Sequence, residues 1–366
     1  MQRFSKYWFV VLAVILVAAV GLVGCSAPAT TPAVPAKPPA QSVNLTGAGA
    51  TFPAPLYTKW FDEYNKLTGV KVNYQPIGSG GGISQITEGT VDFGASDGIM
   101  TEAQLTKAES KNGPILHIPM TSGAVALIYN IANIGGQLKL TGDVLANIYL
   151  KKISKWNDPA IAALNPGLKL PDAAIAVVYR SDGSGTTYIF TNYLSKVSLE
   201  WKDKVGNATS VKWVGDIGGE KSAGVAGQVQ QQPNSIGYVE LAYALQNKLA
   251  VAALQNAAGK FIEPSLAATT RAAEGVTLAD DMKVMLTNST NPDAYPIVGF
   301  TWLLVYVNQK DQAKGEALVK TMWWAIHDGQ KYTEALSYAG LAPAAVVKAE
   351  NAILSIKYLG QPLLSR

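Results

Sequence analysis

One stretch in the middle of the chain limits what this protein can fold into. The apolar, β-branched run 174–178 predicts a buried strand, and apolar residues at helical spacing in 188–194 predict a helix. Between them, residues 179–187 read Tyr-Arg-Ser-Asp-Gly-Ser-Gly-Thr-Thr. The stretch is therefore predicted to be a strand, a glycine turn and the start of a helix.

The start of this helix has the features of a small-anion site. A helix begins with unpaired N–H donors and partial positive charge, which Asp or Glu commonly offsets. Here residues 184–187 are Ser-Gly-Thr-Thr, so the donors stay free, and Arg180 adds a full positive charge that Asp182 can hold in place. The alternative is an ordinary turn with an exposed ion pair, which contributes little stability.

Two earlier stretches repeat this pattern. In 43–53, a predicted strand leads through small residues and Thr51 to a proline, where a first helical turn favours one. In 70–86, a strand leads to the glycine run 78–82, which contains Ser79, and then to a helix. That run lacks the Gly-Lys-Ser/Thr ending of a nucleotide phosphate loop. Three such helix starts, if they converge, would surround one anion with N–H and hydroxyl donors.

Asp97 ends the predicted strand 91–97 and suggests how the site selects its anion. A carboxylate repels an oxyanion unless one of the two carries a proton to share. Hydrogen phosphate has such a proton near neutral pH, and sulfate has none. Asp97 is therefore a candidate selectivity gate against fully deprotonated anions; the alternative is that it only caps a turn.

Composition excludes several other classes of protein. The 366 residues, 48% hydrophobic and 15% charged, suit a folded protein with room for two domains. The net charge is only +4 and the lysines are scattered, so we expect no nucleic-acid partner. One cysteine and two distant histidines give neither an intrachain disulfide nor zinc-ligand spacing. We expect no metal site and no cofactor.

The N-terminus has the pattern of an export signal. Residues 1–24 have a basic start and an apolar run, and Cys25 follows Gly24 directly. Because this ending resembles the lipobox of bacterial lipoproteins, we predict a signal peptide over 1–24 and lipid modification of Cys25; the alternative is a transmembrane anchor. Residues 25–42 are rich in Pro and Ala and are predicted to be a tether. Either reading places the rest outside the cytoplasm.

Beyond the tether, predicted strands and helices alternate, which favours an α/β fold with parallel sheets covered by helices. The apolar runs 115–120 and 123–130 are read as buried strands, with His117 as a core residue, and 297–307 as a further strand. Residues 257–296 show little pattern. The chain is predicted to finish with helices at 312–329 and 343–356.

Four segments together carry a family resemblance: 45–55, 91–97, 180–186 and 236–240. They resemble the PstS family, the phosphate-binding proteins of bacterial high-affinity phosphate ABC transporters, and the likeness runs from Val43 to the C-terminus. The resemblance implies a two-lobed periplasmic-binding-protein fold of type II. Each lobe would be a mainly parallel sheet flanked by helices, and two hinge strands would join them. The implied lobes are 43–121 with 295–366, and 122–294.

The resemblance also implies which residues bind phosphate and what they do. The implied ligands are Thr51, Phe52, Ser79, Asp97, Arg180, Ser184, Gly185 and Thr186, with Asp182 orienting Arg180. Asp97 would accept the phosphate proton. The chain departs from the family pattern at Gly80, where members often have Ser, and at Tyr179, where they often have a basic residue. The second departure removes positive charge beside the predicted site.

We therefore expect a monomeric extracytoplasmic receptor that is lipid-anchored to a bacterial membrane. It would deliver inorganic phosphate to the permease and ATPase subunits of an ABC transporter, and it would not be an enzyme. Two alternatives stay open. One is a secreted hydrolase with Ser184 as nucleophile, although neither His117 nor His327 belongs to a recognisable catalytic motif. The other is a receptor for another oxyanion or a sugar.

Overall fold

A mixed nine-stranded sheet runs through the part of the chain that the computed structural model describes, residues 43–274 and 276–365. The predicted signal peptide, Cys25 and the tether lie outside these residues. The strand order is β2-β1-β3-β12-β4-β8-β6-β7, and β9 also pairs with β4. The strands are β1 Asn44–Gly49, β2 Lys71–Gln75, β3 Phe93–Ser96, β4 Ile115–Asn130, β6 Ala176–Arg180, β7 Ile217–Gly219, β8 Ser235–Glu240, β9 Ala250–Val251 and β12 Val298–Tyr306.

Helices cover the sheet, and short strands form two small additional sheets. The helices are α1 Ala54–Thr68, α2 Ser79–Glu88, α3 Glu102–Asn112, α4 Gly142–Tyr149, α5 Pro159–Ala162, α6 Gly185–Val197, α7 Leu199–Lys204, α8 Lys221–Gln231, α9 Leu241–Gln246, α10 Leu266–Ala273, α11 Gln312–Ile326 and α12 Pro343–Leu354, with 3₁₀ helices η1 Asp328–Tyr332 and η2 Glu334–Leu336. The short strands are β5 Lys139–Leu140, β10 Ala253–Gln255, β11 Phe261–Ile262, β13 Lys357–Tyr358 and β14 Gln361–Pro362.

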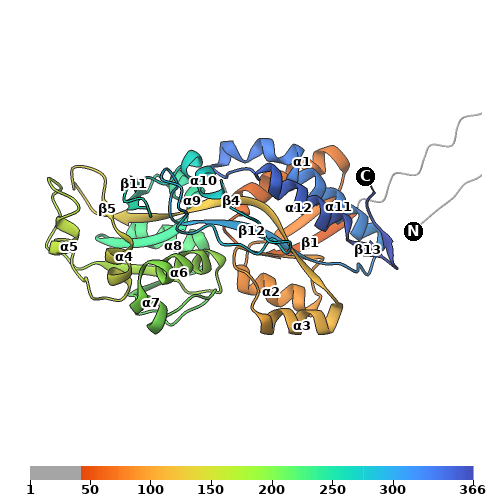
Figure 1. The fold of residues 1–366 in the computed structure, drawn as a ribbon, viewed down its shortest axis with the longest axis horizontal. Coiled ribbons are helices and arrows are strands. Elements are labelled where there is room, and N and C mark those ends of the chain that lie inside the picture. Colours follow the sequence, from red (N-terminus) through yellow and green to blue (C-terminus); the bar gives the residue numbers. More distant parts are fainter. Residues whose placement is uncertain (1–42, 275, 366) are drawn as a thin grey trace, which may run out of the picture. The chain divides into compact units, whose positions relative to one another are not determined.

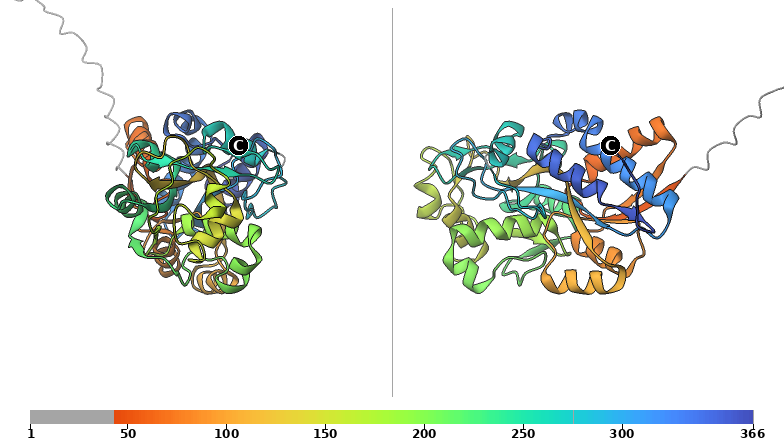
Figure 2. Two further views of the ribbon diagram at one scale, coloured as in Figure 1. Left: turned by 90° about the vertical axis from the view of Figure 1, so that its left-hand side faces the viewer. Right: turned by 45° about the vertical axis from the view of Figure 1, so that its right-hand side comes forward.

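The strand directions divide the sheet into two halves, each belonging to one lobe. On one side β1 pairs in parallel with β2 and β3, and on the other β6 pairs in parallel with β7 and β8. The strands between them, β12 and β4, run antiparallel to each other and to β3 and β8 respectively. In Figures 1 and 2 the yellow-olive to green helices α4 to α7 gather at one end of the sheet, and α1, α2, α3, α11 and α12 gather at the other.

The structure confirms the two-lobed α/β fold but corrects one strand prediction. Residues 115–120 and 123–130 were expected to form two strands; they form the single 16-residue strand β4. The polar pair between the apolar runs, Thr121 and Ser122, is buried and forms three hydrogen bonds with the backbone of Ala339. Since the Thr121 hydroxyl and the Ser122 backbone are satisfied inside the protein, the strand need not break there. β4 and β12 therefore pass from one lobe to the other.

The core confirms some predictions and refines others. His117 is 2% exposed and packs edge-on against Trp302, and burial lowers the pKa of His117 to about 3, so its imidazole is neutral. The helix predicted over 312–329 is shorter: α11 ends at Ile326 and η1 follows it. The poorly patterned segment 257–296 contains α10, which Ser265 caps by accepting from the Ala268 N–H.

Candidate anion site

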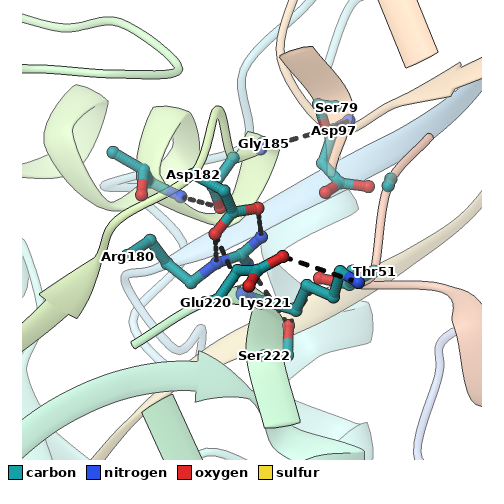
Figure 3. Close-up of polar contacts among 12 residues, drawn as sticks. Thr51, Ser79, Asp97, Arg180, Asp182, Gly185, Glu220, Lys221 and Ser222 are labelled. Carbon is teal, nitrogen blue, oxygen red and sulfur yellow. Dashed lines mark hydrogen bonds and ion pairs between the residues drawn. The ribbon is translucent and has the colours of Figure 1, made fainter. Parts of the chain in front are cut away.

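Four helices begin where strands of the two lobes end, and their first residues meet. α1 and α2 follow β1 and β2 in the first lobe, while α6 and α8 follow β6 and β7 in the second. The Thr51 and Ser222 hydroxyl oxygens lie 2.8 Å apart, and the Gly185 N–H donates to Ser79 Oγ over 3.0 Å. Both contacts join one lobe to the other (Figure 3). The convergence of helix starts predicted from the sequence is confirmed, and α8 adds a fourth.

The missing acidic residue in the first helical turn is a weaker signal than we expected. α1, α2 and α6 lack one, as predicted, but so do α8 to α12. What distinguishes the site is that several of these helix starts face one another, with hydroxyls and a guanidinium between them.

Arg180 ends β6 and supplies the charge of the site. Its side chain is 1% exposed and forms a two-pronged ion pair with Asp182, with Nε to Oδ1 at 2.7 Å and Nη2 to Oδ2 at 2.5 Å. Nη1 also donates to Ser222 over 3.4 Å. Burial alone would raise the pKa of Asp182, but its hydrogen bonds and its attraction to Arg180 lower it. Because a guanidinium has five N–H groups, Asp182 and Ser222 leave part of the fork for a ligand.

Asp97 supplies a buried acceptor. It is 1% exposed, and neither carboxylate oxygen has a hydrogen-bonding partner among the described residues. Burial raises the pKa of Asp97 to about 7; the Arg180 charge and the neighbouring hydroxyls of Thr301 and Ser79 oppose only part of that rise. The Thr301 and Ser79 hydroxyls lie close to the Asp97 carboxylate, but neither is in hydrogen-bonding geometry with it. A buried carboxyl that can take up or release a proton near pH 7 is suited to sharing one with a ligand.

The hydroxyl groups at the site are placed as donors. Ser79 Oγ accepts from the N–H groups of Asp97 (3.3 Å) and Gly185 (3.0 Å), so its own proton is free to donate. Ser184 Oγ accepts from the Thr187 N–H at 3.1 Å, so its own proton is also free to donate. The buried Thr186 hydroxyl has no partner among the described residues.

Thr51 and Phe52 lie in the turn between β1 and α1 and are 3% and 0% exposed. Neither backbone N–H donates to another described residue. Buried N–H groups are nearly always paired, so these two are suited to a ligand. The residues predicted to bind phosphate are therefore buried in one region, with Asp182 partly exposed beside Arg180, and their roles in binding remain predictions.

The two departures from the family pattern differ in their importance. Gly80 lies between the lobes: its N–H donates to the Gly183 carbonyl at 2.9 Å, and a Cβ on Gly80 would lie 3.1 Å from the Gly183 Cα. Tyr179 is next to Arg180 on β6 and so projects from the opposite face of the sheet. Its ring stacks on Trp213 with centroids 5.4 Å apart. The absence of a basic residue at 179 therefore removes no side chain from the site.

Sequence reasoning missed Ser222, which links Arg180 to Thr51. A signal was present, because the strand β7 leads through Gly218 and Gly219 to a hydroxyl at the start of α8. This is the same arrangement that marked the other three helix starts. Lys221 is the first residue of α8, where a backbone N–H has no partner within the helix. Its N–H donates instead to Asp182 Oδ1 at 2.9 Å.

The described residues show no pairing of Ser184 with a base. His117 Nε2 accepts from the Met100 N–H, and His327 contacts Glu350 and the Trp323 carbonyl. Within the described ranges there is also no cluster of three or more potential metal ligands, and no helix combines the length and apolar character needed to cross a bilayer.

Comparisons with known proteins identify relatives of this chain. A sequence profile described as a PBP superfamily domain matches residues 33–321. The chain is 48% identical over 330 residues to the phosphate-binding protein PstS of Xylella fastidiosa, covering 89% of both chains, and 47% identical over 311 residues to PstS of Pasteurella multocida, covering 84% of this chain and 89% of that protein. Its fold is similar to a phosphate-binding protein from Stenotrophomonas maltophilia (TM-score 0.67, 20% identity, covering 85% and 94%).

Proposed function

Because the chain belongs to the PstS family of phosphate-binding proteins, we propose that it binds inorganic phosphate between its two lobes and delivers it to an ABC transporter for import. The observation that carries the proposal is the buried, unpartnered carboxyl of Asp97 in the same site as Arg180. The site then holds one cation, one proton acceptor and several hydroxyl and N–H donors. Hydrogen phosphate, which is anionic and carries a proton, complements all three.

In the proposed complex, each group has one task. Arg180, held by Asp182, binds phosphate oxygens with the free part of its fork. The N–H groups of Thr51 and Phe52 and the hydroxyls of Ser79, Ser184 and Thr186 donate to the remaining oxygens. Asp97 accepts the phosphate proton. The Gly185 N–H donates to Ser79 here, so it contributes either directly or by orienting that hydroxyl.

Calorimetric titration tests this proposal directly. We expect phosphate to bind with a dissociation constant of about micromolar or lower, and a large excess of sulfate at pH 8 should not compete. Asp97→Asn is the matched variant, because an amide can donate to sulfate where a carboxylate repels it. Equal binding of phosphate and sulfate by the unaltered protein would contradict the selectivity role assigned to Asp97. Binding of neither anion would contradict the proposed function.

The proposed partners are the permease and ATPase subunits of the transporter. A receptor of this kind acts by lobe closure, because the permease can distinguish the closed, loaded form from the open one. We propose that the receptor works as a monomer and not as an enzyme. The proposed lobes are 43–121 with 295–366, and 122–294; the first boundary falls within β4 and the second just before β12.

We further propose that the receptor is a lipoprotein, exported by its signal peptide 1–24 and held at a bacterial membrane through a lipid on Cys25. The support is the sequence pattern itself, in which the only cysteine of the chain directly follows the apolar run. Cell fractionation is the test: Cys25→Ala should move the protein from the membrane to the soluble envelope fraction. Unchanged association with membranes would contradict lipid anchoring.

A further inference from the structure

Three consecutive carbonyl groups in the turn between β1 and α1 each accept a hydrogen bond from a different tyrosine hydroxyl. The pairs and their distances are Tyr74 to Ala50 (2.6 Å), Tyr243 to Thr51 (2.7 Å) and Tyr338 to Phe52 (2.7 Å). The three tyrosines come from distant parts of the chain. Water can also satisfy backbone carbonyls in a turn. Because three adjacent peptides each use a tyrosine hydroxyl instead, we infer that the orientation of this backbone has to be fixed.

Peptide geometry shows what these contacts orient. The C=O of one residue and the N–H of the next belong to one planar, trans peptide unit and point in opposite directions. A hydroxyl that holds the Ala50 carbonyl therefore also aims the Thr51 N–H, and one that holds the Thr51 carbonyl aims the Phe52 N–H. Both N–H groups lack a partner among the described residues. Tyr74 and Tyr243 thus act on the two backbone donors assigned to phosphate.

Tyr243 differs from the other two tyrosines in the lobe it comes from. It lies on α9, which follows β8 in the second lobe, whereas Thr51 lies in the first. Tyr74 is on β2, and Tyr338 follows η2; both belong to the lobe that contains Thr51. If the lobes separate as proposed, the Tyr243 hydrogen bond breaks, whereas the other two lie within one lobe and can persist.

We propose that Tyr243 is a positioning residue that aligns the Phe52 N–H with the bound anion on lobe closure, and so sets how slowly phosphate leaves. This inference rests on the proposed function and adds a residue to it. A hydroxyl donating to a carbonyl also polarises the peptide, which strengthens the N–H of the same unit as a donor. Tyr243 joins the two lobes to the ligand without touching it.

Stopped-flow kinetics of phosphate binding separates this role from a purely structural one. In Tyr243→Phe, which loses only the hydroxyl, we expect the dissociation rate of phosphate to rise about 5- to 10-fold and the association rate to stay within about twofold. The thermal midpoint of the ligand-free protein should not change. Tyr306→Phe is the control: that hydroxyl donates to the Ile86 carbonyl at 3.1 Å, away from the site, so both rates should be unchanged.

Three results would overturn the proposal. The dissociation rate of Tyr243→Phe could match that of Tyr306→Phe, the loss of affinity could lie wholly in association, or the ligand-free midpoint could fall in step with affinity. If the unaltered protein binds phosphate and any one of these results is found, only the inference about Tyr243 is refuted. If the unaltered protein does not bind phosphate, the proposed function fails and the inference fails with it.

Discussion

We propose that the acid strength of a single side chain, Asp97, governs the selectivity of the site. Because burial raises its pKa to about 7, Asp97 in the ligand-free protein is ionised at pH 8 and protonated at pH 5. A protonated carboxyl can donate to sulfate, and an ionised one repels it. The discrimination against sulfate should therefore be strong at pH 8 and weaker at pH 5.

This predicts that sulfate competes with phosphate at pH 5 and not at pH 8. Competition calorimetry at the two pH values measures the effect, and we expect the apparent affinity for sulfate to rise at least tenfold, about 1.4 kcal/mol, on acidification. Asp97→Asn should bind sulfate to the same extent at both values. A sulfate affinity independent of pH in the unaltered protein would show that Asp97 does not discriminate by its charge.

Glu240 is a buried carboxyl near the site, and its pKa is strongly raised. It is 0% exposed; burial raises its pKa well above the usual range, and the charge of Asp97 raises it further. The Tyr338 hydroxyl contacts the Phe52 carbonyl at 2.7 Å and donates to Glu240 Oε2 at 3.0 Å, and the same oxygen accepts from the Ala242 N–H at 2.8 Å. Glu240 thus contacts the tyrosine that holds the Phe52 carbonyl.

The sign of the resulting pH dependence follows from the raised pKa. Below pH 4.5 the carboxyl is protonated in both the folded and the unfolded chain. Above that it ionises only in the unfolded chain, so its stabilising contribution declines by about 1.4 kcal/mol per pH unit until the folded pKa is reached. Glu240→Gln cannot ionise and should lose less stability than the unaltered protein between pH 5 and pH 8.

Urea unfolding at pH 5 and pH 8 measures this effect, and Glu102→Gln at an exposed position is the control. We expect the difference in unfolding free energy between the unaltered protein and Glu240→Gln to shift in favour of Gln from pH 5 to pH 8. A parallel loss of stability in both proteins would mean that Glu240 is ionised in the folded state.

At the scale of the elements, the start of α6 fits against the first lobe only because Gly185 has no side chain. A Cβ there would lie 2.5 Å from both Asp97 Oδ2 and Ser79 Oγ. In Figure 3, Gly185 and the hydroxyl of Ser79 approach each other directly. Glycine is needed here for the close approach of two elements, and backbone strain is not involved.

Gly185→Ala should accordingly weaken phosphate binding about 10- to 100-fold by hindering closure. The ligand-free protein should keep its unfolding free energy within about 0.5 kcal/mol, because the clash involves the opposite lobe. The control is Gly227→Ala on α8, where a Cβ would meet nothing within 4 Å: it should leave affinity unchanged and stabilise the helix by up to about 1 kcal/mol. Equal affinity of the two variants would show that closure tolerates the methyl group.

At the scale of the described residues as a whole, β4 and β12 carry the chain between the lobes, and the contacts across the site hold the lobes together. The Gly80 N–H donates to the Gly183 carbonyl, and Ser79 and Thr51 contact Gly185 and Ser222. These contacts are few compared with the continuous pairing of β4 with β12. We infer that the crossing strands persist when the site opens, while the contacts across it separate.

Small-angle X-ray scattering tests this closure. Phosphate should lower the radius of gyration of residues 43–366 from its ligand-free value, which for a compact chain of this length is about 20 Å. Gly185→Ala should show a smaller decrease at the same phosphate concentration. If saturating phosphate leaves the unaltered protein's radius unchanged, the lobes do not move on binding.

The sequence by itself determined most of the element order and predicted the chemistry of the site. Periodicity placed the main strands and helices but divided β4 in two and missed α10, since it reflects only neighbours along the chain. Glycine and hydroxyl residues at three helix starts, together with Arg180 and Asp97, identified anion binding, and the segment resemblance identified the family. These signals are local, so they survive without knowledge of the fold.

The tertiary structure decided which distant residues complete that site. Ser222 meets Thr51 across 171 positions of sequence, Tyr243 meets Thr51 across 192, and Tyr338 meets Phe52 across 286. The glycines before Ser222 mark a helix start but not the residue that Ser222 meets, and the tyrosines carry no local mark at all, because such contacts arise only when the sheet order brings the two segments together. The same holds for Asp97 and Glu240, whose raised pKa values come from burial that no stretch of sequence specifies alone.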